Sequence, residues 1–458
     1  MSSNWTPSRL FIRYGTGKHL SAGVIVTDFS LTDNHHQNHV QNKECRRDLL
    51  SGTASISIYI HIPFCVRKCS YCDFLSGPRT PQLQERYVQA LIREIGAQRD
   101  CPSGTPVDTI FFGGGTPSVL SAGQIGRIME ALREQFSILA DAEISMEMNP
   151  GTADADQLSA LKKTGLNRLS IGVQSMHDEE LRLLGRIHCA AEARQAFDMA
   201  REAGFDNINI DLMSALPGQT FESWADSLRQ AVEWKPEHIS AYSLIIEPGT
   251  PFSDLYDSGK LPALPDEETD RSMYHYTRRF LAQHGYERYE ISNYALPGRE
   301  CRHNTGYWTG HPYLGFGIGA ASYVNGTRFS NTADFEAYLS FCEDNLCEDN
   351  LCADNLCKGN LSEDGLCEDG ICEDIRTDVH VLSQEEKMEE FMFLGLRMTA
   401  GVSGAEFASR FHKTLDEAYG TVIRRHVAQG LLQPTAEGFC LTERGTDVSN
   451  YVMADYLM

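Results

Sequence analysis

The chain has no long apolar run and little positive charge. None of its 458 residues belongs to a stretch of about 18 uncharged apolar residues, the length that a membrane-spanning helix needs. Its 40 Lys and Arg stand against 63 Asp and Glu. Nucleic-acid binding requires a basic surface that releases counterions from phosphates, so we expect no nucleic-acid partner. An apolar secretory leader is also lacking, which favours a reducing, cytoplasmic setting.

Cysteine, by contrast, is abundant. Of the fourteen cysteines, three stand close together as Cys65, Cys69 and Cys72, six lie in residues 342–375, and five are scattered. A closed structural zinc site takes four ligands, yet no Cys or His follows Cys72 at short range. A four-iron cluster held by three thiolates keeps one iron open for a small molecule with its own amine and carboxylate, such as S-adenosylmethionine. Zinc and three structural thiols are the alternatives.

Short strands alternate with helical stretches from residue 56 onward, which is typical of βα units around a parallel sheet. Five strands share a phase, with one apolar face and one face that carries polar side chains. A sheet buried on both faces would read as a continuous apolar run, so the pattern predicts a barrel-like sheet with a polar, ligand-holding lumen. In such barrels the site lies at the carboxyl ends of the strands. The polar positions are Tyr59, Glu147, Gln174, Asp211 and Tyr242.

Helices are expected between these strands and again after them. The candidates are residues 82–99, 121–135, 178–203, 221–234, 386–396 and 415–432, and residues 438–445 are expected to form a short strand and turn.

Two regions lack such patterning. Residues 1–54 are expected to be a partly disordered extension. Because residues 1–26 contain basic residues and no acid, a mitochondrial transit peptide is the alternative. Residues 342–375 contain five-residue units such as CEDNL and carry eleven acidic residues. They are interpreted as a solvated insert, with soft-metal binding by their thiols as the alternative.

A glycine run and a carboxylate that faces inward are further candidates for ligand binding in the predicted lumen. Gly114, Gly115 and Thr116 follow a strand, and glycines let backbone N–H groups approach a ligand closely. Glu147 faces the predicted lumen, where a carboxylate is costly unless it is paired or hydrogen-bonded. A tight turn and an ion pair inside the barrel are the purely structural alternatives.

These motifs, together with the sequence His303-Asn-Thr-Gly-Tyr-Trp308, resemble the HemN/HemW branch of the radical S-adenosylmethionine superfamily. The resemblance covers roughly residues 56–340 and 376–458. It implies a partial (βα)6 barrel over residues 55–290, a region with the HNxxYW motif over 291–341, and a small helical, winged-helix-like C-terminal domain over 376–458.

The resemblance also implies the ligands and their residues. A [4Fe–4S] cluster would be held by Cys65, Cys69 and Cys72. S-adenosylmethionine would be bound by Tyr59, Tyr71, Gly114, Gly115, Thr116, Glu147, Gln174, Arg186 and Asp211.

Phe74 separates two functions within the branch. Its oxygen-independent coproporphyrinogen III oxidases, enzymes of porphyrin biosynthesis, carry Cys at this place, whereas its heme chaperones carry Phe. We therefore expect a heme chaperone that delivers heme to an unidentified acceptor protein, with the oxidase as the alternative; whether the chain is an enzyme stays open. His303 is the candidate heme ligand, and a hydrogen-bonded core histidine is the alternative. Peripheral membrane contact with the acceptor is compatible with this interpretation.

Overall fold

The structure, a computed structural model, describes residues 55–344 and 375–457. The predictions for residues 1–54 lie outside the described residues, as does nearly all of the insert 342–375. Cys342 is described: its thiol is free and buried in the core, on α10 (Phe335–Asp344).

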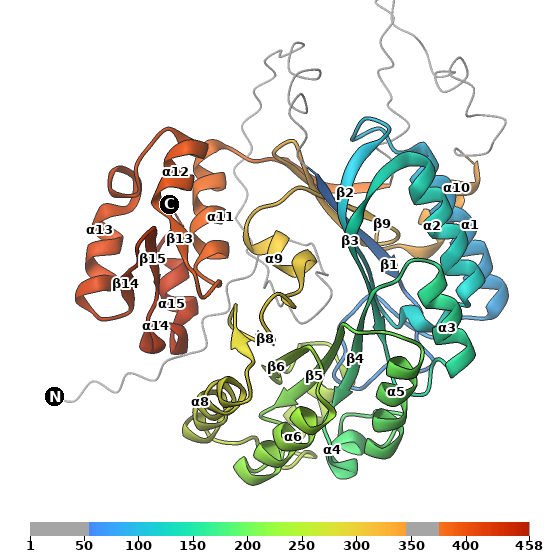
Figure 1. The fold of residues 1–458 in the computed structure, drawn as a ribbon, viewed down its shortest axis with the longest axis horizontal. Helices are drawn as coiled ribbons and strands as arrows, with labels where there is room; N and C mark the ends of the chain where they lie inside the picture. The colour runs from blue at the N-terminus through green and yellow to red at the C-terminus, as the bar shows by residue number, and fades with distance from the viewer. Residues whose placement is uncertain (1–54, 345–374, 458) are drawn as a thin grey trace, which may run out of the picture.

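Six parallel strands follow one another both along the chain and across the sheet. The sheet curves into an open barrel with helices on its outer face (Figure 1). The predicted partial barrel is therefore confirmed. The strands are β1 (Ile56–Ile62), β2 (Thr105–Gly114), β3 (Phe136–Met148), β4 (Arg168–Gln174), β5 (Ile208–Ser214) and β6 (His238–Ser243).

The two faces of the strands differ as their phase predicts. Ile58 and Ile60 are fully buried in the main apolar core, to which the outer helices contribute. Tyr59, between them, packs in a separate cluster with Phe111 and Cys301. Since successive side chains point to opposite faces of a strand, this second cluster lies in the lumen.

The outer helices begin at capping side chains such as Thr80, Ser121 and Thr220. One prediction is wrong: residues 178–203 form two helices rather than one. Gly185, at φ 73°, ends the first of them, and the break places Arg186 in the connection. The helices are α1 (Pro81–Ala97), α2 (Ala122–Gln135), α3 (Ala155–Lys163), α4 (Asp178–Leu183), α5 (Ala190–Glu202) and α6 (Phe221–Trp234).

The sheet continues beyond the six strands at both edges to twelve strands in all. Beside β1 lie β9 (Tyr313–Phe316), β10 (Ala321–Val324), β11 (Thr327–Asn331) and β12 (Arg376–Val381). Beside β6 lie β8 (Asn293–Ala295) and β7 (Glu287–Arg288). The short helices here are η1 (Pro117–Val119), α7 (Pro251–Asp257) and α9 (Arg302–Trp308), and a longer one is α8 (Glu267–Gln283).

The C-terminal part is helical, as predicted, and has its own apolar core around Met392, Phe407 and Val452. The predicted helix 415–432 is too long: it ends at Ala428, because Gly430 has a φ of 68° and Leu432 begins a strand. The elements are α11 (Gln384–Gly395), α12 (Gly404–Phe411), α13 (Leu415–Ala428), α14 (Glu443–Asp447), α15 (Ser449–Ala454), β13 (Val402–Ser403), β14 (Leu432–Pro434) and β15 (Gly438–Leu441).

Helix α9 lies between the curved sheet and the C-terminal helices (Figure 1). The guanidinium of Arg397, after α11, stacks 4.2 Å from the ring centroid of Trp308 at the end of α9. The C-terminal part therefore packs on the helix that carries the HNxxYW motif.

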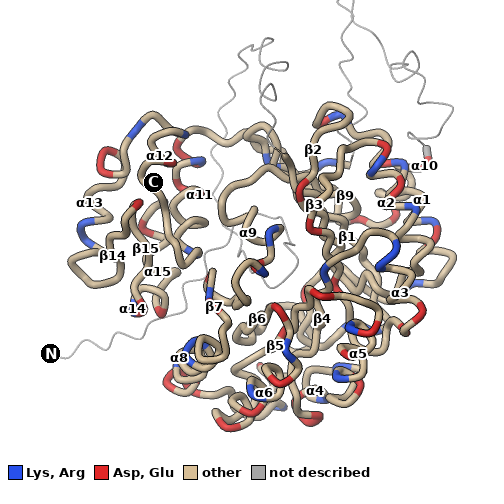
Figure 2. The backbone as a smooth tube through the Cα atoms, in the orientation of Figure 1, with Lys and Arg blue, Asp and Glu red and all other residues tan. Residues whose placement is uncertain are grey.

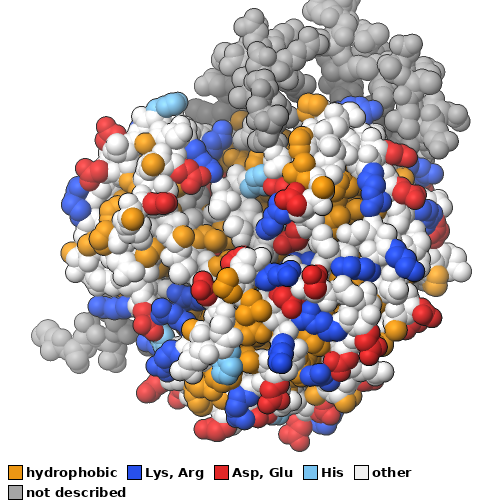
Figure 3. All heavy atoms as spheres, in the orientation of Figure 1, with side chains coloured by type: hydrophobic (Ala, Val, Ile, Leu, Met, Phe, Trp, Pro, Cys, Tyr) orange, Lys and Arg blue, Asp and Glu red, His pale blue; other side chains and the backbone are white. Residues whose placement is uncertain are grey.

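Acidic and basic residues are scattered along the described backbone (Figure 2), and their side chains intermingle over the face seen in Figure 3. Within residues 55–344 and 375–457, no helix is both long and apolar enough to cross a membrane.

Candidate functional site

The three cysteines of the predicted cluster loop follow β1 at the carboxyl end of the barrel. All three are half-buried, free thiols. Two backbone hydrogen bonds anchor the loop. The amide of Cys65 donates to the carbonyl of Gly77 at 3.1 Å, and the amide of Ser70 donates to the carbonyl of Leu184 at 3.3 Å. The thiols are thus presented on one anchored loop.

Two hydrogen-bond donors point at the sulfur atoms. Thr116 Oγ1 donates to Cys65 Sγ at 3.6 Å, and a guanidinium N–H of Arg186 donates to Cys69 Sγ at 3.5 Å. Burial raises the pKa of the Cys72 thiol to about 11. Donors and a positive charge stabilise thiolates, the form that binds iron, and so offset part of the cost of burial.

The glycine run lies directly against this loop. Its amides continue the pairing with the end of β1, since Gly115 N–H donates to Ile62 at 2.9 Å and Thr116 N–H donates to Phe64 at 2.6 Å. A Cβ at Gly115 would lie 2.5 Å from the Phe64 carbonyl oxygen, so only glycine permits this approach. The run therefore brings the predicted residues Gly114, Gly115 and Thr116 beside Cys65.

A polar bridge of Thr116, Asn149 and Arg186 connects two of the cysteines. Asn149 Nδ2 donates to Thr116 Oγ1 at 2.8 Å, and Arg186 Nη2 donates to Asn149 Oδ1 at 2.6 Å and to the Gly172 carbonyl at 2.5 Å. With the contacts to sulfur, the path runs Cys65–Thr116–Asn149–Arg186–Cys69. We did not predict Asn149 as a site residue from the sequence, although it lies just past the end of β3 and has the same phase as Glu147.

Two half-buried carboxyls, those of Glu147 and Asp211, face the lumen below this bridge. Glu147 accepts a hydrogen bond from the Gly114 amide at 3.0 Å, and its pKa is raised to about 8 by burial and by the nearby Asp211. Asp211 accepts from Ser170 at 3.1 Å and from Asn209 at 2.7 Å, and burial raises its pKa as well. Glu147 is therefore largely protonated at neutral pH and can both donate and accept hydrogen bonds.

Gln174 ends β4 in a left-handed conformation, with a φ of 68°. Its side-chain oxygen accepts from Tyr242 OH at 2.9 Å. Few residues other than glycine adopt this region, and such strain concentrates at ligand sites.

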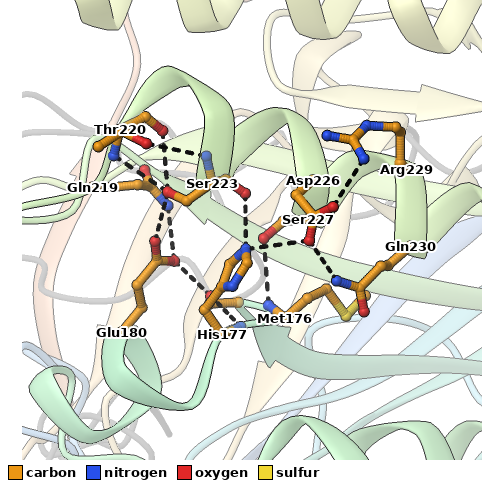
Figure 4. Close-up of polar contacts among 11 residues, drawn as sticks. Met176, His177, Glu180, Gln219, Thr220, Ser223, Asp226, Ser227, Arg229 and Gln230 are labelled. Carbon is orange, nitrogen blue, oxygen red and sulfur yellow. Dashed lines mark hydrogen bonds and ion pairs between the residues drawn. The ribbon is translucent and has the colours of Figure 1, made fainter.

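The next loop is held by Glu180, which accepts hydrogen bonds from Ser175 at 2.5 Å, from Gln219 at 3.0 Å and from Ser223 at 2.9 Å. Figure 4 shows Glu180 joining Gln219 and Ser223 at the start of α6. This network fixes the left-handed end of β4 against the loop between β5 and α6.

The two predicted tyrosines lie in different places. Tyr71, in the cysteine loop, packs against the cluster that contains Leu184 and Phe252. Tyr59 lies deeper in the lumen, where its hydroxyl is 3.0 Å from Nδ1 of His61. His61, which was not predicted, is fully buried and would collide with a Cβ at Gly114.

His303 contacts lumen residues rather than the cysteine loop. Its Nδ1 is 2.8 Å from Thr109 Oγ1, its Nε2 is 2.9 Å from Tyr307 OH, and its ring stacks on Phe111 at 5.1 Å. It is 1% exposed, and burial lowers its pKa to about 3. Both ring nitrogens of this neutral imidazole are engaged, so binding a metal would require one hydrogen bond to be exchanged.

The residues at the barrel mouth suit an iron–sulfur cluster and S-adenosylmethionine. In the part of the chain that the structure describes, no three His, Cys, Asp or Glu side chains converge closely enough to hold one metal ion. A single zinc needs such convergence at about 2.3 Å, whereas a four-iron cluster gives each thiolate its own iron. Glu147, with one hydrogen bond from Gly114, retains capacity for a ligand hydroxyl or amine.

Comparisons with known proteins identify the family of the chain. A Radical SAM superfamily model matches residues 59–231, and a HemN C-terminal domain model matches 382–448. Heme chaperone HemW of Bacillus subtilis is 37% identical over 403 residues, which cover 88% of this chain and 99% of that protein. Radical S-adenosyl methionine domain-containing protein 1, mitochondrial, of Danio rerio is 35% identical over 270 residues, 59% of this chain and 61% of that one.

The fold also matches a solved structure, that of coproporphyrinogen III oxidase (HemN) from Escherichia coli, described as a radical SAM enzyme. The TM-score is 0.71 at 25% identity, and the match covers 88% of this chain and 90% of that chain. The chain thus belongs to the HemW family, in the HemN/HemW branch of the radical SAM superfamily.

Proposed function

We propose that the chain is a heme chaperone, which holds a [4Fe–4S] cluster on Cys65, Cys69 and Cys72, binds S-adenosylmethionine, and passes heme to an acceptor protein. The observation that carries the cofactor part is the polar bridge of Thr116, Asn149 and Arg186, which ties the thiol loop to the lumen. Heme as the cargo is supported by the name of the Bacillus subtilis relative, heme chaperone HemW, since the match covers 99% of that protein.

Each lumen residue has a role in this proposal. When bound, the cluster and its cofactor supply one-electron chemistry at the barrel mouth. Arg186 and Thr116 stabilise negative charge on sulfur, and Gly114 and Gly115 let the backbone approach the cofactor. Glu147, protonated at neutral pH, hydrogen-bonds a hydroxyl or amine of the cofactor. Gln174 and Asp211 complete the pocket, and Tyr59 and Tyr71 shield it from water.

We further propose His303 as the heme ligand. Its imidazole is neutral, which is the form that binds iron. Ligation requires iron to replace Thr109 at Nδ1 or Tyr307 at Nε2. A stacked aromatic neighbour, Phe111, suits a flat macrocycle.

The experiment is anaerobic reconstitution of the full chain, followed by heme titration and a coproporphyrinogen III assay. The proposal predicts a saturable Soret shift on heme binding and no decarboxylated product. Heme-loaded protein should then transfer its heme to an added apo-hemoprotein faster than heme-loaded albumin does, as followed by the change in the Soret band. A chain that binds no heme would overturn the chaperone function.

The second candidate is an oxygen-independent coproporphyrinogen III oxidase, and the structural match to that enzyme over 88% of this chain favours it. Phe74 opposes it, because the oxidases of the branch carry Cys there; the Phe74 side chain is exposed beside the cysteine loop. Formation of protoporphyrinogen from coproporphyrinogen III would promote the oxidase over the chaperone.

We place the protein in the cytoplasm. Import into mitochondria is the alternative if residues 1–26 act as a transit peptide, and the relative from Danio rerio carries the word mitochondrial in its name. Fluorescent fusions with and without residues 1–54 distinguish the two locations.

A further inference from the structure

The tautomer of His303 decides which of its nitrogens can bind iron. A neutral imidazole carries its proton on one nitrogen and a lone pair on the other, and only the lone pair ligates a metal. Both nitrogens of His303 have a hydroxyl partner, Thr109 at Nδ1 and Tyr307 at Nε2. Because a hydroxyl can donate or accept, the direction of each hydrogen bond depends on the groups beyond it.

A path of hydroxyl groups leads from Nδ1 to a carboxylate. Thr109 Oγ1 donates to Ser57 Oγ at 2.8 Å, and Ser57 Oγ donates to Asp108 Oδ1 at 3.5 Å. Ser57 and Thr109 are both buried, at 3% and 2% exposed, so the protein itself supplies these contacts. The hydroxyl path therefore runs His303–Thr109–Ser57–Asp108.

A β-bulge brings Asp108 to this path. In the pairing of β1 with β2, Ser57 lies opposite Thr109. The preceding pair is Ile56 with Val107, so Asp108 is skipped, and it is skipped again in the pairing of β2 with β3. A bulge re-aims a side chain that would otherwise point to the other face of the sheet. Here it places the Asp108 carboxylate on the same side as the Ser57 hydroxyl.

Asp108 is an ionised acceptor. Its second oxygen, Oδ2, accepts from Ser55 Oγ at 2.8 Å and lies 3.2 Å from Nε2 of His311. Burial acts to raise the pKa of Asp108, but these neighbours hold that pKa below its ordinary value. An ionised carboxylate accepts hydrogen bonds and cannot donate them. Ser57 must therefore give its proton to Asp108.

The other directions along the path follow from this constraint. Because Ser57 donates to Asp108, it accepts from Thr109, and the single hydroxyl proton of Thr109 is used there. Thr109 can then only accept from His303, which requires the imidazole proton on Nδ1. Nε2 has the lone pair and accepts from Tyr307 OH. Burial raises the pKa of Tyr307, so this hydroxyl keeps the proton that it donates.

We propose that the hydroxyl path from Asp108 holds His303 in the Nδ1–H tautomer and leaves Nε2 as the atom that binds iron. The inference rests on the proposed function for iron as the ligand, whereas the tautomer is a property of the chain without heme. A ligating histidine commonly donates its other ring N–H to an acceptor that orients the ring and increases its basicity. Asp108, Ser57 and Thr109 are thus positioning residues, and Tyr307 is the group that iron displaces.

The tautomer is measured by nitrogen NMR of the full chain without heme, produced with isotopically labelled histidine. Protonated and unprotonated ring nitrogens resonate in separate regions, and the signals missing from His303→Gln are those of His303. Wild type should show a protonated Nδ1 and an unprotonated Nε2. The reverse pattern would overturn the inference.

Substitutions along the path test what sets the tautomer. Asp108→Asn places an amide where the acceptor was, a change that gives a histidine the wrong tautomer. Thr109→Val removes the hydroxyl at similar side-chain size, whereas Thr109→Ser keeps it. The first two should lose the wild-type pattern, and Thr109→Ser should retain it. The control Asp141→Asn removes an exposed carboxylate beside Arg302 of α9 and should match wild type. An unchanged tautomer in both Asp108→Asn and Thr109→Val would overturn the role of the path.

Heme titration tests the assignment of Nε2. Asp108→Asn should weaken heme binding by about 10- to 100-fold, the usual cost of losing a partner of a ligating histidine. Tyr307→Phe should strengthen it by about 5-fold, because iron no longer displaces a hydrogen bond. Weaker binding by Tyr307→Phe would overturn Nε2 as the ligating atom.

The two readouts separate this inference from the proposed function. A wild-type chain that binds no heme, or a His303→Gln chain that binds it unchanged, overturns iron as the ligand of Nε2. The NMR pattern of the path variants still decides whether Asp108 sets the tautomer, since it is recorded without heme.

Discussion

The two ends of the barrel lumen each contain a buried arginine, and the two differ in how fully they are bonded. At the carboxyl end, Arg186 donates to Cys69, to Asn149 and to the Gly172 carbonyl. At the amino end, Arg168 has no hydrogen-bond partner among the described residues. Arg186 is bonded to three acceptors within the protein, while Arg168 is buried without a hydrogen-bond acceptor at its Nε. The comparison shows that two buried arginines can differ in how many acceptors depend on them.

The largest effect is expected at the cysteine loop. Ser in place of Cys65, Cys69 or Cys72 should abolish the reconstituted cluster, because a hydroxyl is a poor ligand for iron in this setting. Absorbance near 400 nm and iron content measure the loss. Cys189→Ser, at a half-buried free thiol outside the loop, is the matched control and should retain the cluster. A full cluster in the three loop variants would refute the assignment.

The arginine pair gives the sharpest test of the difference between the two ends. Arg186→Met should destabilise the fold by about 3 kcal/mol, since it leaves the bonded acceptors of Asn149 and Gly172 buried and unpaired. Arg168→Met should cost little or stabilise, because it strands no acceptor. Denaturant unfolding of the two variants decides this, and equal destabilisation would abolish the distinction.

The raised pKa of Glu147 predicts that the stability of the fold depends on pH. Its pKa is about 8 in the folded protein and 4.5 as the ordinary value, so between these pH values the folded chain holds one proton more than the unfolded chain. Stability should therefore fall as pH rises from 4.5 to 8. Between pH 6 and 7.5 the contribution is about 2 kcal/mol, and Glu147→Gln should remove it. Unfolding at both pH values, with exposed Glu179→Gln as control, measures the effect; parallel pH profiles would show that Glu147 is ionised in the fold.

His303 gives an effect with the opposite sign, which is smaller than that of Glu147 between pH 6 and 7.5 because only part of the imidazole titration falls in this range. Its folded pKa of about 3 lies below the ordinary 6.5, so the unfolded chain takes up a proton first as pH falls. Stability from the neutral imidazole should be present above pH 6.5 and decline below it. Heme ligation by His303 should in turn change little between pH 6.5 and 8. An unaltered Soret band and affinity in His303→Ala would exclude this residue as the ligand.

The fold followed from the sequence where local pattern decides structure. The shared phase of the strands predicted the curved sheet and its polar lumen, because alternation along a strand is a local property. The break at Gly185 was missed, since the apolar spacing on both sides fits one helix while a left-handed glycine ends it. The added strands β9 to β12 were missed because their pairing is set by contacts distant in sequence.

The residues of the candidate site were likewise predicted only in part. Motif spacing pointed to the cysteines, Gly114 to Thr116 and Glu147. It did not reveal Asn149, whose importance comes from bridging Thr116 and Arg186 across three chain segments. Nor did it distinguish Arg186 from Arg168, because the acceptors around a buried guanidinium are set by the fold. Such features require coordinates, because they are relations between residues distant in sequence.

The measurement that tests the central claim most directly is the electron paramagnetic resonance spectrum of the reduced, anaerobically reconstituted chain with and without S-adenosylmethionine. The account predicts about four irons per chain in one cluster on Cys65, Cys69 and Cys72, and a spectrum that changes when the cofactor is added. An iron content below one per chain, or a cluster spectrum that the cofactor leaves unchanged, would contradict it.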